Sequence, residues 1–452
     1  MGHREDGYMK KHLLIAAVIS FSTVLLVGCK KTSKKVENYL QLDKYEYTLF
    51  EDESFVLNGT TNLSGTISYS SENNRIASVS SSGRVIAKKE GQTRILASVE
   101  DLKAYCNLTV KPLSEKNEDY ITFEENDFAI GLNEKQTYQI KPSYYSGGSK
   151  IEKSFTYVSE DESVAKVNES GVITPIKEGM ASILVSSNDV LAAVYVDVYT
   201  IKMNTKEDWL AMLATTENKE ARFYLNQDID MSGVEYEPTA TYGNYLMGEL
   251  NGDYHSVKNI TMKESFDKQS VFGFATAFSL YNIAFENVLF TSSIVEYNCG
   301  LFVSYMHHIT EKDSSGKDVN NVYPAVINTV LCDFRYTQSS GCLIAEKFYG
   351  GIIQDVFGYM RDENGNPMLM EHSYAIAKEF YLWWEPNTIS NVICYVPNGD
   401  ISIHPESEST GLPISFDGIH KTDSLIEADY LANTYLDTNV WDVTPNQIPS
   451  FK

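Results

Sequence analysis

Short runs of alternating apolar and polar residues fill the chain between residues 36 and 200. A period of two residues predicts β-strands with one buried face. The runs occur twice in the same order at an offset of 88 residues, so that Gly83 and Gly91 of the first copy correspond to Gly171 and Gly179 of the second. Glycine tolerates the positive φ angles of tight turns. The pattern predicts two small β-sandwiches with Gly83 and Gly171 in equivalent turns.

A second pattern starts near residue 204. Thr205 caps a short predicted helix with acidic residues in its first turn. Beyond it, each unit has a small apolar strand and then a strand with a central amide, as in 271–274 and 280–283. One unit cannot bury its apolar face alone, so the units are expected to stack as coils of a β-solenoid. The inward rows of this stack should include or adjoin Ile260, Ile283, Val330 and Val356.

Amide side chains recur along these units. Steps of 23 and 26 residues between them suit one coil, whereas steps of 46 and 37 residues require inserted loops. A stacked amide can hydrogen-bond to its equivalent in the next coil; the alternative is an ordinary turn residue. The C-terminal segment around Trp441 and Phe451 should cap or flank the last coil, because an open end exposes strand edges. The predicted amide row runs through Asn259, Asn282, Asn328, Gln354 and Asn391.

The first residues of the chain have the pattern of an export signal. A basic stretch at 10–12 precedes the uncharged run 13–27, which is too short to span a membrane. The run ends in Leu-Val-Gly-Cys at Cys29, which resembles the lipobox of bacterial lipoproteins. The resemblance implies a signal peptide at 1–28, a lipid on Cys29 and a tether at 29–37, with the protein outside the cytoplasm and anchored to the cell membrane or outer membrane. The alternative is an uncleaved helical anchor.

Family resemblances also cover the rest of the chain. The Ser-Gly and Lys-Glu-Gly turns of the repeat resemble group-2 bacterial immunoglobulin-like domains, here at 38–112 and 119–200. Region 204–452 resembles GLUG-repeat surface proteins and right-handed parallel β-helices, through "YLNQDIDMSG", "LNGDYHSVKNI" and its Gly-Leu-Phe strand. Cys299, Val303 and Ala345 stand where the pattern usually has glycine. The resemblances imply an all-β chain with two immunoglobulin-like sandwiches followed by a right-handed parallel β-helix (solenoid).

Charge and cysteine content exclude some classes of binding partner. The formal net charge of −24 argues against nucleic-acid binding, which needs a basic face. With Cys29 assigned to the lipid, five cysteines remain, an odd number without metal-type spacing. They are expected to be buried free thiols, and a disulfide such as Cys332–Cys342 is the alternative.

No motif for catalysis, metal binding or cofactor binding is present, so none of these is predicted. His307 and His308 are adjacent on the chain, and neighbouring strand residues point to opposite faces, so they should not share one metal ion. Parallel β-helices include polysaccharide lyases and hydrolases, which gather carboxylates on one face. Asp228, Asp230 and Asp253 are acidic and near the predicted coils. Asp228 and Asp230 belong to the opening segment on which the family resemblance rests, so a structural role is favoured for these two.

Aromatic residues near the inserted loops are the predicted ligand contacts, because loops on a rigid scaffold commonly bind ligands. The alternative for the tryptophans is a purely structural position against the side of the solenoid. We predict a non-enzymatic surface adhesin or binding module for a glycan or protein; the alternative is a surface-anchored carbohydrate-active enzyme. The predicted contacts are Tyr305, His307, His308, Tyr323, Trp383 and Trp384.

Overall fold

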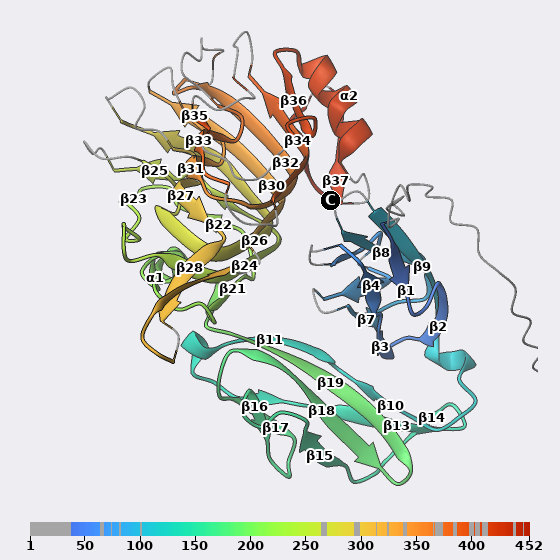
Figure 1. Ribbon diagram of the computed structural model, residues 1–452. Coiled ribbons are helices and arrows are strands. Elements are labelled where there is room, and N and C mark those ends of the chain that lie inside the picture. The colour runs from blue at the N-terminus through green and yellow to red at the C-terminus, as the bar shows by residue number, and fades with distance from the viewer. Residues whose placement is uncertain are drawn as a thin grey trace, which may run out of the picture. The chain divides into compact units, whose positions relative to one another are not determined.

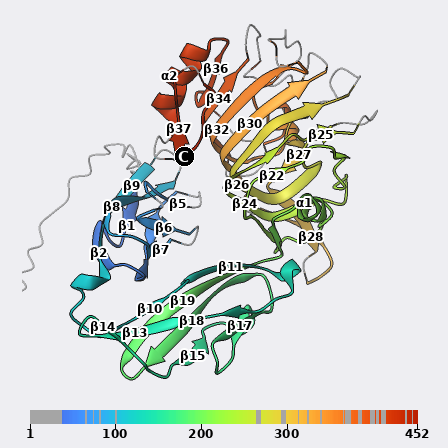
Figure 2. The same ribbon diagram turned by 180° about the vertical axis from the view of Figure 1, so that it is seen from behind.

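A computed structural model of the chain is shown from opposite sides (Figure 1 and Figure 2). The predicted leader and tether, with Cys29, lie outside the described residues. In the described part, none of the helices is long and apolar enough to cross a membrane. The structure describes residues 38–452 except 64–66, 74, 81–82, 100–101, 264–268, 293–298, 313, 323–324, 338–340, 365, 367–373, 383–386, 397–401, 403–406, 409–414, 437–439 and 446.

The first repeat forms two sheets that share one apolar core. Leu49 on one sheet and Val85 on the other are buried in the same cluster, together with Ile95, so the sheets pack face to face as a sandwich. The larger sheet has the order β2-β9-β8-β5 and the smaller β3-β7-β6, and β1 pairs with β4. The strands are β1 (Leu40–Leu42), β2 (Glu46–Phe50), β3 (Ser54–Val56), β4 (Gly59–Thr61), β5 (Ser68–Ser71), β6 (Ala77–Val79), β7 (Arg84–Ala87), β8 (Gly91–Val99) and β9 (Leu102–Lys111).

The second repeat has the same topology. Its sheets have the orders β11-β19-β18-β15 and β12-β17-β16, and a third sheet has the order β10-β13-β14. Its elements are η1 (Leu113–Glu115), β10 (Tyr120–Phe123), β11 (Asp127–Gly131), η2 (Leu132–Glu134), β12 (Tyr138–Gln139), β13 (Pro142–Ser146), β14 (Ser149–Ile151), β15 (Thr156–Ser159), β16 (Ala165–Val167), β17 (Val172–Pro175), β18 (Gly179–Ser187) and β19 (Val190–Tyr199).

The predicted equivalence of the two turn glycines is confirmed. Gly83 has a φ of +81° and Gly171 a φ of +77°. The carbonyl of Gly83 accepts a hydrogen bond from the N–H of Leu57 at 2.8 Å, and that of Gly171 accepts one from Ile140 at 2.9 Å. Both glycines therefore close the same turn in the same backbone conformation, which other residues rarely adopt.

After the second repeat, the described residues form one sheet of fifteen strands. The arrangement of its strands can be followed in Figure 1. Every pairing found in this sheet is parallel. The strands are β20 (Ile201–Met203), β21 (Arg222–Leu225), β22 (Ile229–Asp230), β23 (Glu235–Tyr236), β24 (Leu246–Lys258), β25 (Thr261–Met262), β26 (Phe274–Phe290), β27 (Phe302–Met306), β30 (Val326–Tyr336), β31 (Ala345–Phe348), β32 (Gly351–Asp362), β33 (Ala377–Phe380), β34 (Asn387–Tyr395), β35 (Ser407–Glu408) and β36 (Ile419–Thr422).

The inner face of this sheet carries apolar side chains in rows. Ile283, Val330 and Val356 are in register on β26, β30 and β32, and all three are fully buried, as predicted. Ile260 is also fully buried, but the pairing of Thr261 with Leu289 places it in another row. Helix α1 (Lys206–Leu213) begins at its predicted cap, because the Thr205 hydroxyl accepts a hydrogen bond from the Asp208 N–H at 3.2 Å.

The predicted amide row is confirmed only in part. Asn282, Thr329, Asp355 and Asn391 have φ between +53° and +56°, and the register places them on successive strands. Asn328 and Gln354 each stand one residue before this row. The residues of this row therefore share a left-handed backbone conformation, which Asn and Asp adopt readily, and do not all carry an amide side chain. Asn259 belongs to a separate row, where its side chain accepts a hydrogen bond from Asn287 at 2.6 Å.

The outer face of the same strands carries a second apolar core. Leu331, Phe357 and Ile393 are in register and buried outside the first core. Helix α2 (Leu425–Tyr435) lies beside β34 and β36 and covers this face together with β37 (Trp441–Asp442) and β38 (Ser450–Phe451) (Figure 1 and Figure 2). The C-terminal segment thus flanks the sheet, which is one of the two predicted outcomes. Helix α2 was not predicted.

The insert in the longest step is a hairpin of β28 (His308–Lys312) and β29 (Asp318–Val322). The five cysteines of the described residues are buried and free, so the predicted thiols are confirmed and the alternative disulfide is not formed. Burial raises the pKa of Cys394 to about 12, which keeps its thiol protonated and unreactive.

Candidate ligand-binding surface

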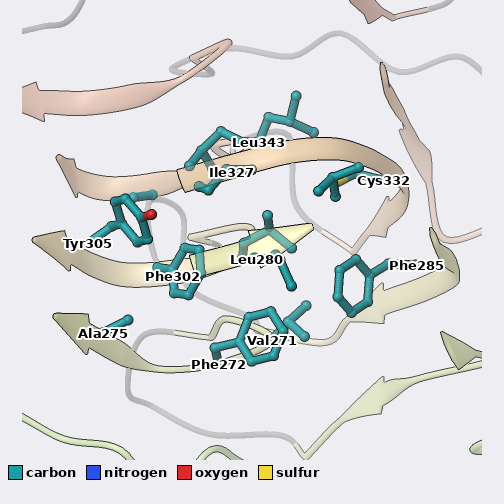
Figure 3. Close-up of a cluster of buried hydrophobic side chains, with 14 of the residues drawn as sticks. Val271, Phe272, Ala275, Leu280, Phe285, Phe302, Tyr305, Ile327, Cys332 and Leu343 are labelled. Atoms are coloured by element: carbon teal, nitrogen blue, oxygen red, sulfur yellow. The ribbon is translucent and has the colours of Figure 1, made fainter. Parts of the chain in front are cut away.

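The structure does not place all of the predicted contact residues on the surface. Tyr305 is fully buried and belongs to the cluster of apolar side chains shown in Figure 3. Its hydroxyl donates a hydrogen bond to the Phe278 carbonyl at 2.8 Å. Its ring stacks on Phe348 at 5.8 Å. The prediction that Tyr305 contacts a ligand is wrong, because strand β27 extends to Met306 and turns Tyr305 into the core. His307 is fully buried as well.

The other predicted contacts have different outcomes. His308 is half-buried at the start of β28, and burial lowers the pKa of its imidazole, which keeps the ring neutral. Its carbonyl accepts a hydrogen bond from the Thr276 hydroxyl at 2.7 Å. Tyr323, Trp383 and Trp384 lie outside the described residues, so their predicted roles stay predictions. His308 is therefore the one predicted contact that the structure describes and leaves partly accessible.

Five other aromatic residues form what we call the aromatic surface: Tyr242, Tyr245, Phe274, Tyr349 and Tyr381. Tyr242 is 84% exposed, and its ring centroid lies 6.2 Å from that of Tyr245 and 6.4 Å from that of Phe274. Tyr349 and Tyr381 stack at 4.8 Å with an interplanar angle of 16°. The ring of His308 lies 6.5 Å from that of Tyr349, which connects the predicted histidine to this surface.

A tight turn holds Tyr242 in its exposed position. Thr241 and Asn244 exchange two backbone hydrogen bonds of 3.0 and 2.9 Å, so Tyr242 and Gly243 form the tip between them. The Thr216 hydroxyl donates to the Asn244 side chain at 2.6 Å, and the Glu217 carboxylate accepts a hydrogen bond from the Tyr245 N–H. The turn is thus tied to the preceding segment rather than freely projecting.

Strand register positions the two stacked tyrosines. Phe348 on β31 is in register with Phe380 on β33, and both side chains are buried in the core. The next residues, Tyr349 and Tyr381, are half-buried. Adjacent strands lie about 4.8 Å apart, which matches the separation of the two rings. The stacking of Tyr349 on Tyr381 therefore follows from the parallel pairing of β31 with β33.

An ion pair lies beside the stacked rings of Tyr349 and Tyr381. The ammonium of Lys347 lies 3.4 Å from the Glu379 carboxylate, which also accepts a hydrogen bond of 2.5 Å from the Tyr381 hydroxyl. Burial alone would lower the pKa of Lys347, but the Glu379 charge raises it. Burial raises the pKa of Tyr349 and of Tyr245, and neighbouring Tyr242 raises both further. These phenols remain protonated donors at neutral pH.

The acids considered for catalysis have structural partners. Asp228 accepts a hydrogen bond from the Ser256 N–H at 2.9 Å and pairs with Lys258 at 3.0 Å; although burial opposes it, these contacts lower the pKa of Asp228. Hydrogen bonds from Asn259 and Ser232 lower the pKa of Asp230 to about 2.

Asp253 accepts a hydrogen bond from the Tyr224 hydroxyl at 2.6 Å. A general acid needs a pKa near the working pH, so Asp228 and Asp230 are poorly suited to that role. Within the ranges that the structure describes, no group of three or more His, Cys, Asp or Glu side chains could hold a metal ion.

Sequence reasoning missed the aromatic surface although one signal was present. Residues 345–349 read Ala-Glu-Lys-Phe-Tyr and residues 377–381 read Ala-Lys-Glu-Phe-Tyr. The shared Phe-Tyr pair indicates one inward and one outward ring at the same position of two equivalent strands. Nothing comparable in the sequence links Tyr242 to them.

Comparison with known proteins gave neither a matching family model nor a matching curated protein. Among solved structures, the S-layer protein rSbsC is 18% identical over 37% of this chain and 28% of its own length, with a TM-score of 0.17. Human protocadherin-24 EC1-2 is 10% identical over 36% of this chain and 98% of that one, with a TM-score of 0.16. The tandem Ig repeats of Dlar are 8% identical, with a TM-score of 0.22. The matched part thus spans under a third of the S-layer protein, and the fold of this chain rests on its own topology.

Proposed function

We propose that this chain is a bacterial surface lipoprotein that binds a glycan without catalysing its turnover. In this proposal Cys29 carries the lipid, two immunoglobulin-like modules at 38–112 and 119–200 form a stalk, and a right-handed parallel β-helix at 204–452 presents the ligand site. The observation that carries the binding role is the aromatic surface, since exposed tyrosine rings stack on the apolar faces of sugars.

The parallel pairings support the β-helix. Ile283, Val330 and Val356 lie side by side on successive strands. A β-helix would produce this row if each coil contributed one of the three residues. The row of left-handed residues from Asn282 to Asn391 recurs in the same way and fits one corner of each coil. A rigid stack of this kind holds surface side chains in fixed positions, which lowers the entropy lost on binding.

The pKa values and hydrogen bonds of the three candidate aspartates favour a binding role over catalysis. The lowered pKa of Asp228 and of Asp230, and the hydrogen bond that occupies Asp253, suit structural roles. Turnover of a polysaccharide by the purified chain, lost on replacing one carboxylate, would instead favour the surface-anchored enzyme.

Truncating the aromatic surface should abolish most binding. We expect Tyr242→Ala to weaken the Kd for a glycan identified on an array at least tenfold, about 1.4 kcal/mol, because the exposed ring would be the stacking platform. The measurement is calorimetric titration of the chain produced without residues 1–29.

Tyr435→Ala is the matched control, since Tyr435 is also an exposed tyrosine (38%) but lies on α2, which packs on β34 and β36. Equal affinities of the wild type and the Tyr242 variant would exclude the aromatic surface as the binding site.

Lipid anchoring is tested separately. Cys29→Ala should release or mislocalise the protein, because the thiol is the proposed attachment point of the lipid. Metabolic labelling with palmitate should mark the wild type and not the variant. Equal labelling of both proteins would contradict the lipoprotein assignment and would leave the binding role untouched.

A further inference from the structure

The charges beside the aromatic surface are predominantly negative. The exposed Glu217 carboxylate accepts a hydrogen bond from the Tyr245 N–H, and the Glu379 carboxylate accepts one from the Tyr381 hydroxyl at 2.5 Å. Lys347 is the cation in this group, and its charge is already paired with Glu379 at 3.4 Å. The whole chain adds a net charge of −24. A surface of this kind repels polyanions, which need arginine or lysine side chains for recognition.

The aromatic surface is elongated across the strands of the sheet. Phe274, Ser304, Lys347 and Glu379 occupy one register row on the neighbouring strands β26, β27, β31 and β33. The aromatic surface starts at the turn beside Phe274 and reaches Tyr381, the residue that follows β33. Three strand spacings of about 4.8 Å give it a length of roughly 14 Å, or about three pyranose units in a row. An elongated ligand therefore fits better across the strands than along one of them.

The side chains offer the two kinds of contact that an uncharged sugar makes. Tyr242 exposes most of its ring, which suits stacking on the C–H face of a pyranose. The rings of Tyr349 and Tyr381 face each other, so this pair presents ring edges and hydroxyl groups instead. A carboxylate has about four acceptor positions, so Glu379 can accept hydrogen bonds from sugar hydroxyls in addition to those it already makes.

We infer that the aromatic surface binds a neutral oligosaccharide, about three pyranose units long, lying across β26, β27, β31 and β33. The inference rests on the proposed glycan-binding function and adds the class of glycan, its minimum length and its direction. Uronic acid polymers and sulfated glycans are excluded as ligands, because their negative charges would meet the carboxylates of Glu217 and Glu379, and the charge of Lys347 is already paired with Glu379.

The test uses the chain without residues 1–29 on an array of neutral hexose oligomers of one to six units, beside oligogalacturonates and heparin fragments. We expect at least one neutral series to bind, with affinity rising up to about three units and then levelling off. Raising NaCl from about 50 to 500 mM should change this Kd less than twofold, because no counterions are released by an uncharged ligand. Tyr242→Ala should weaken it at least tenfold.

A second variant tests the electrostatic argument. Glu379→Gln keeps a hydrogen-bond acceptor but removes the carboxylate that lies 3.4 Å from the Lys347 ammonium, so it should raise the affinity for oligogalacturonate severalfold. If wild-type protein binds only acidic glycans, in a salt-sensitive manner, the neutral-ligand inference is wrong and the glycan-binding function stands. If a folded chain, verified by circular dichroism, binds no glycan on the array, the proposed function itself is wrong.

Discussion

Trp441→Ala should destabilise the C-terminal region by about 3–5 kcal/mol, the usual cost of truncating a buried large aromatic side chain. Trp441 is only 1% exposed and packs against Phe451 at a centroid distance of 4.8 Å. It belongs to the outer core with Leu331, Phe357 and Ile393. Removing the indole would leave a cavity and expose the outer face of β30, β32 and β34 to water.

Hydrogen exchange is the suitable measurement, because a chain with several cores need not unfold in one step. We expect amides of β30, β32 and β34 to lose protection in Trp441→Ala, while those of β8 and β18 keep it. Trp441→Phe is the matched control and should cost less, since it retains an aromatic ring in the same site. Unchanged protection in the alanine variant would show that the C-terminal segment does not stabilise the sheet.

Gly83→Val should destabilise the first sandwich by roughly 1–3 kcal/mol, and Gly171→Val the second by a similar amount. Both glycines have positive φ, which a β-branched residue adopts at high cost. A Cβ at Gly83 would lie 2.3 Å from the Leu57 carbonyl oxygen, and one at Gly171 would lie 2.7 Å from the Tyr157 ring. The backbone oxygen cannot move without breaking the turn, so the larger effect is expected at Gly83.

The control for this pair is Gly147→Asn. Gly147 has a φ of +57°, but a Cβ there would meet nothing within 4 Å, and asparagine tolerates the left-handed region. Exchange measured in each sandwich should show lost protection in β7 and β8 for Gly83→Val, in β17 and β18 for Gly171→Val, and in neither for the control. Loss of protection in both sandwiches from one substitution would contradict the expectation that each glycine stabilises only its own sandwich.

Local patterns in the sequence were sufficient for the two sandwiches. A turn glycine and an alternating strand depend only on residues close along the chain, so the offset of 88 residues predicted equivalent turns at Gly83 and Gly171. The same reasoning identified Thr205 as the cap of α1, because a cap bonds to an amide three residues away. The rows through Ile283, Val330 and Val356 were also predictable, since each strand repeats at the same phase.

Pairing between distant segments decided the rest. Whether Tyr305 lies in a loop or a strand depends on whether β27 pairs with β31, which local sequence does not specify, and the pairing turned the residue inward. The run Val392-Ile393-Cys394 is apolar on both faces, but its outer partner is α2, more than thirty residues further on.

The aromatic surface could not be predicted from the sequence for the same reason. Tyr242 and Tyr381 lie 139 positions apart, and they reach one surface only because the strands near them, β26, β27, β31 and β33, pair in parallel as neighbours in one sheet. Sequence alone therefore determined the strands, turns and inward rows, which depend on short-range conformational preference and side-chain alternation. Tertiary structure decided which outward residues become neighbours, because that depends on register between strands and on the elements that cover the outer face.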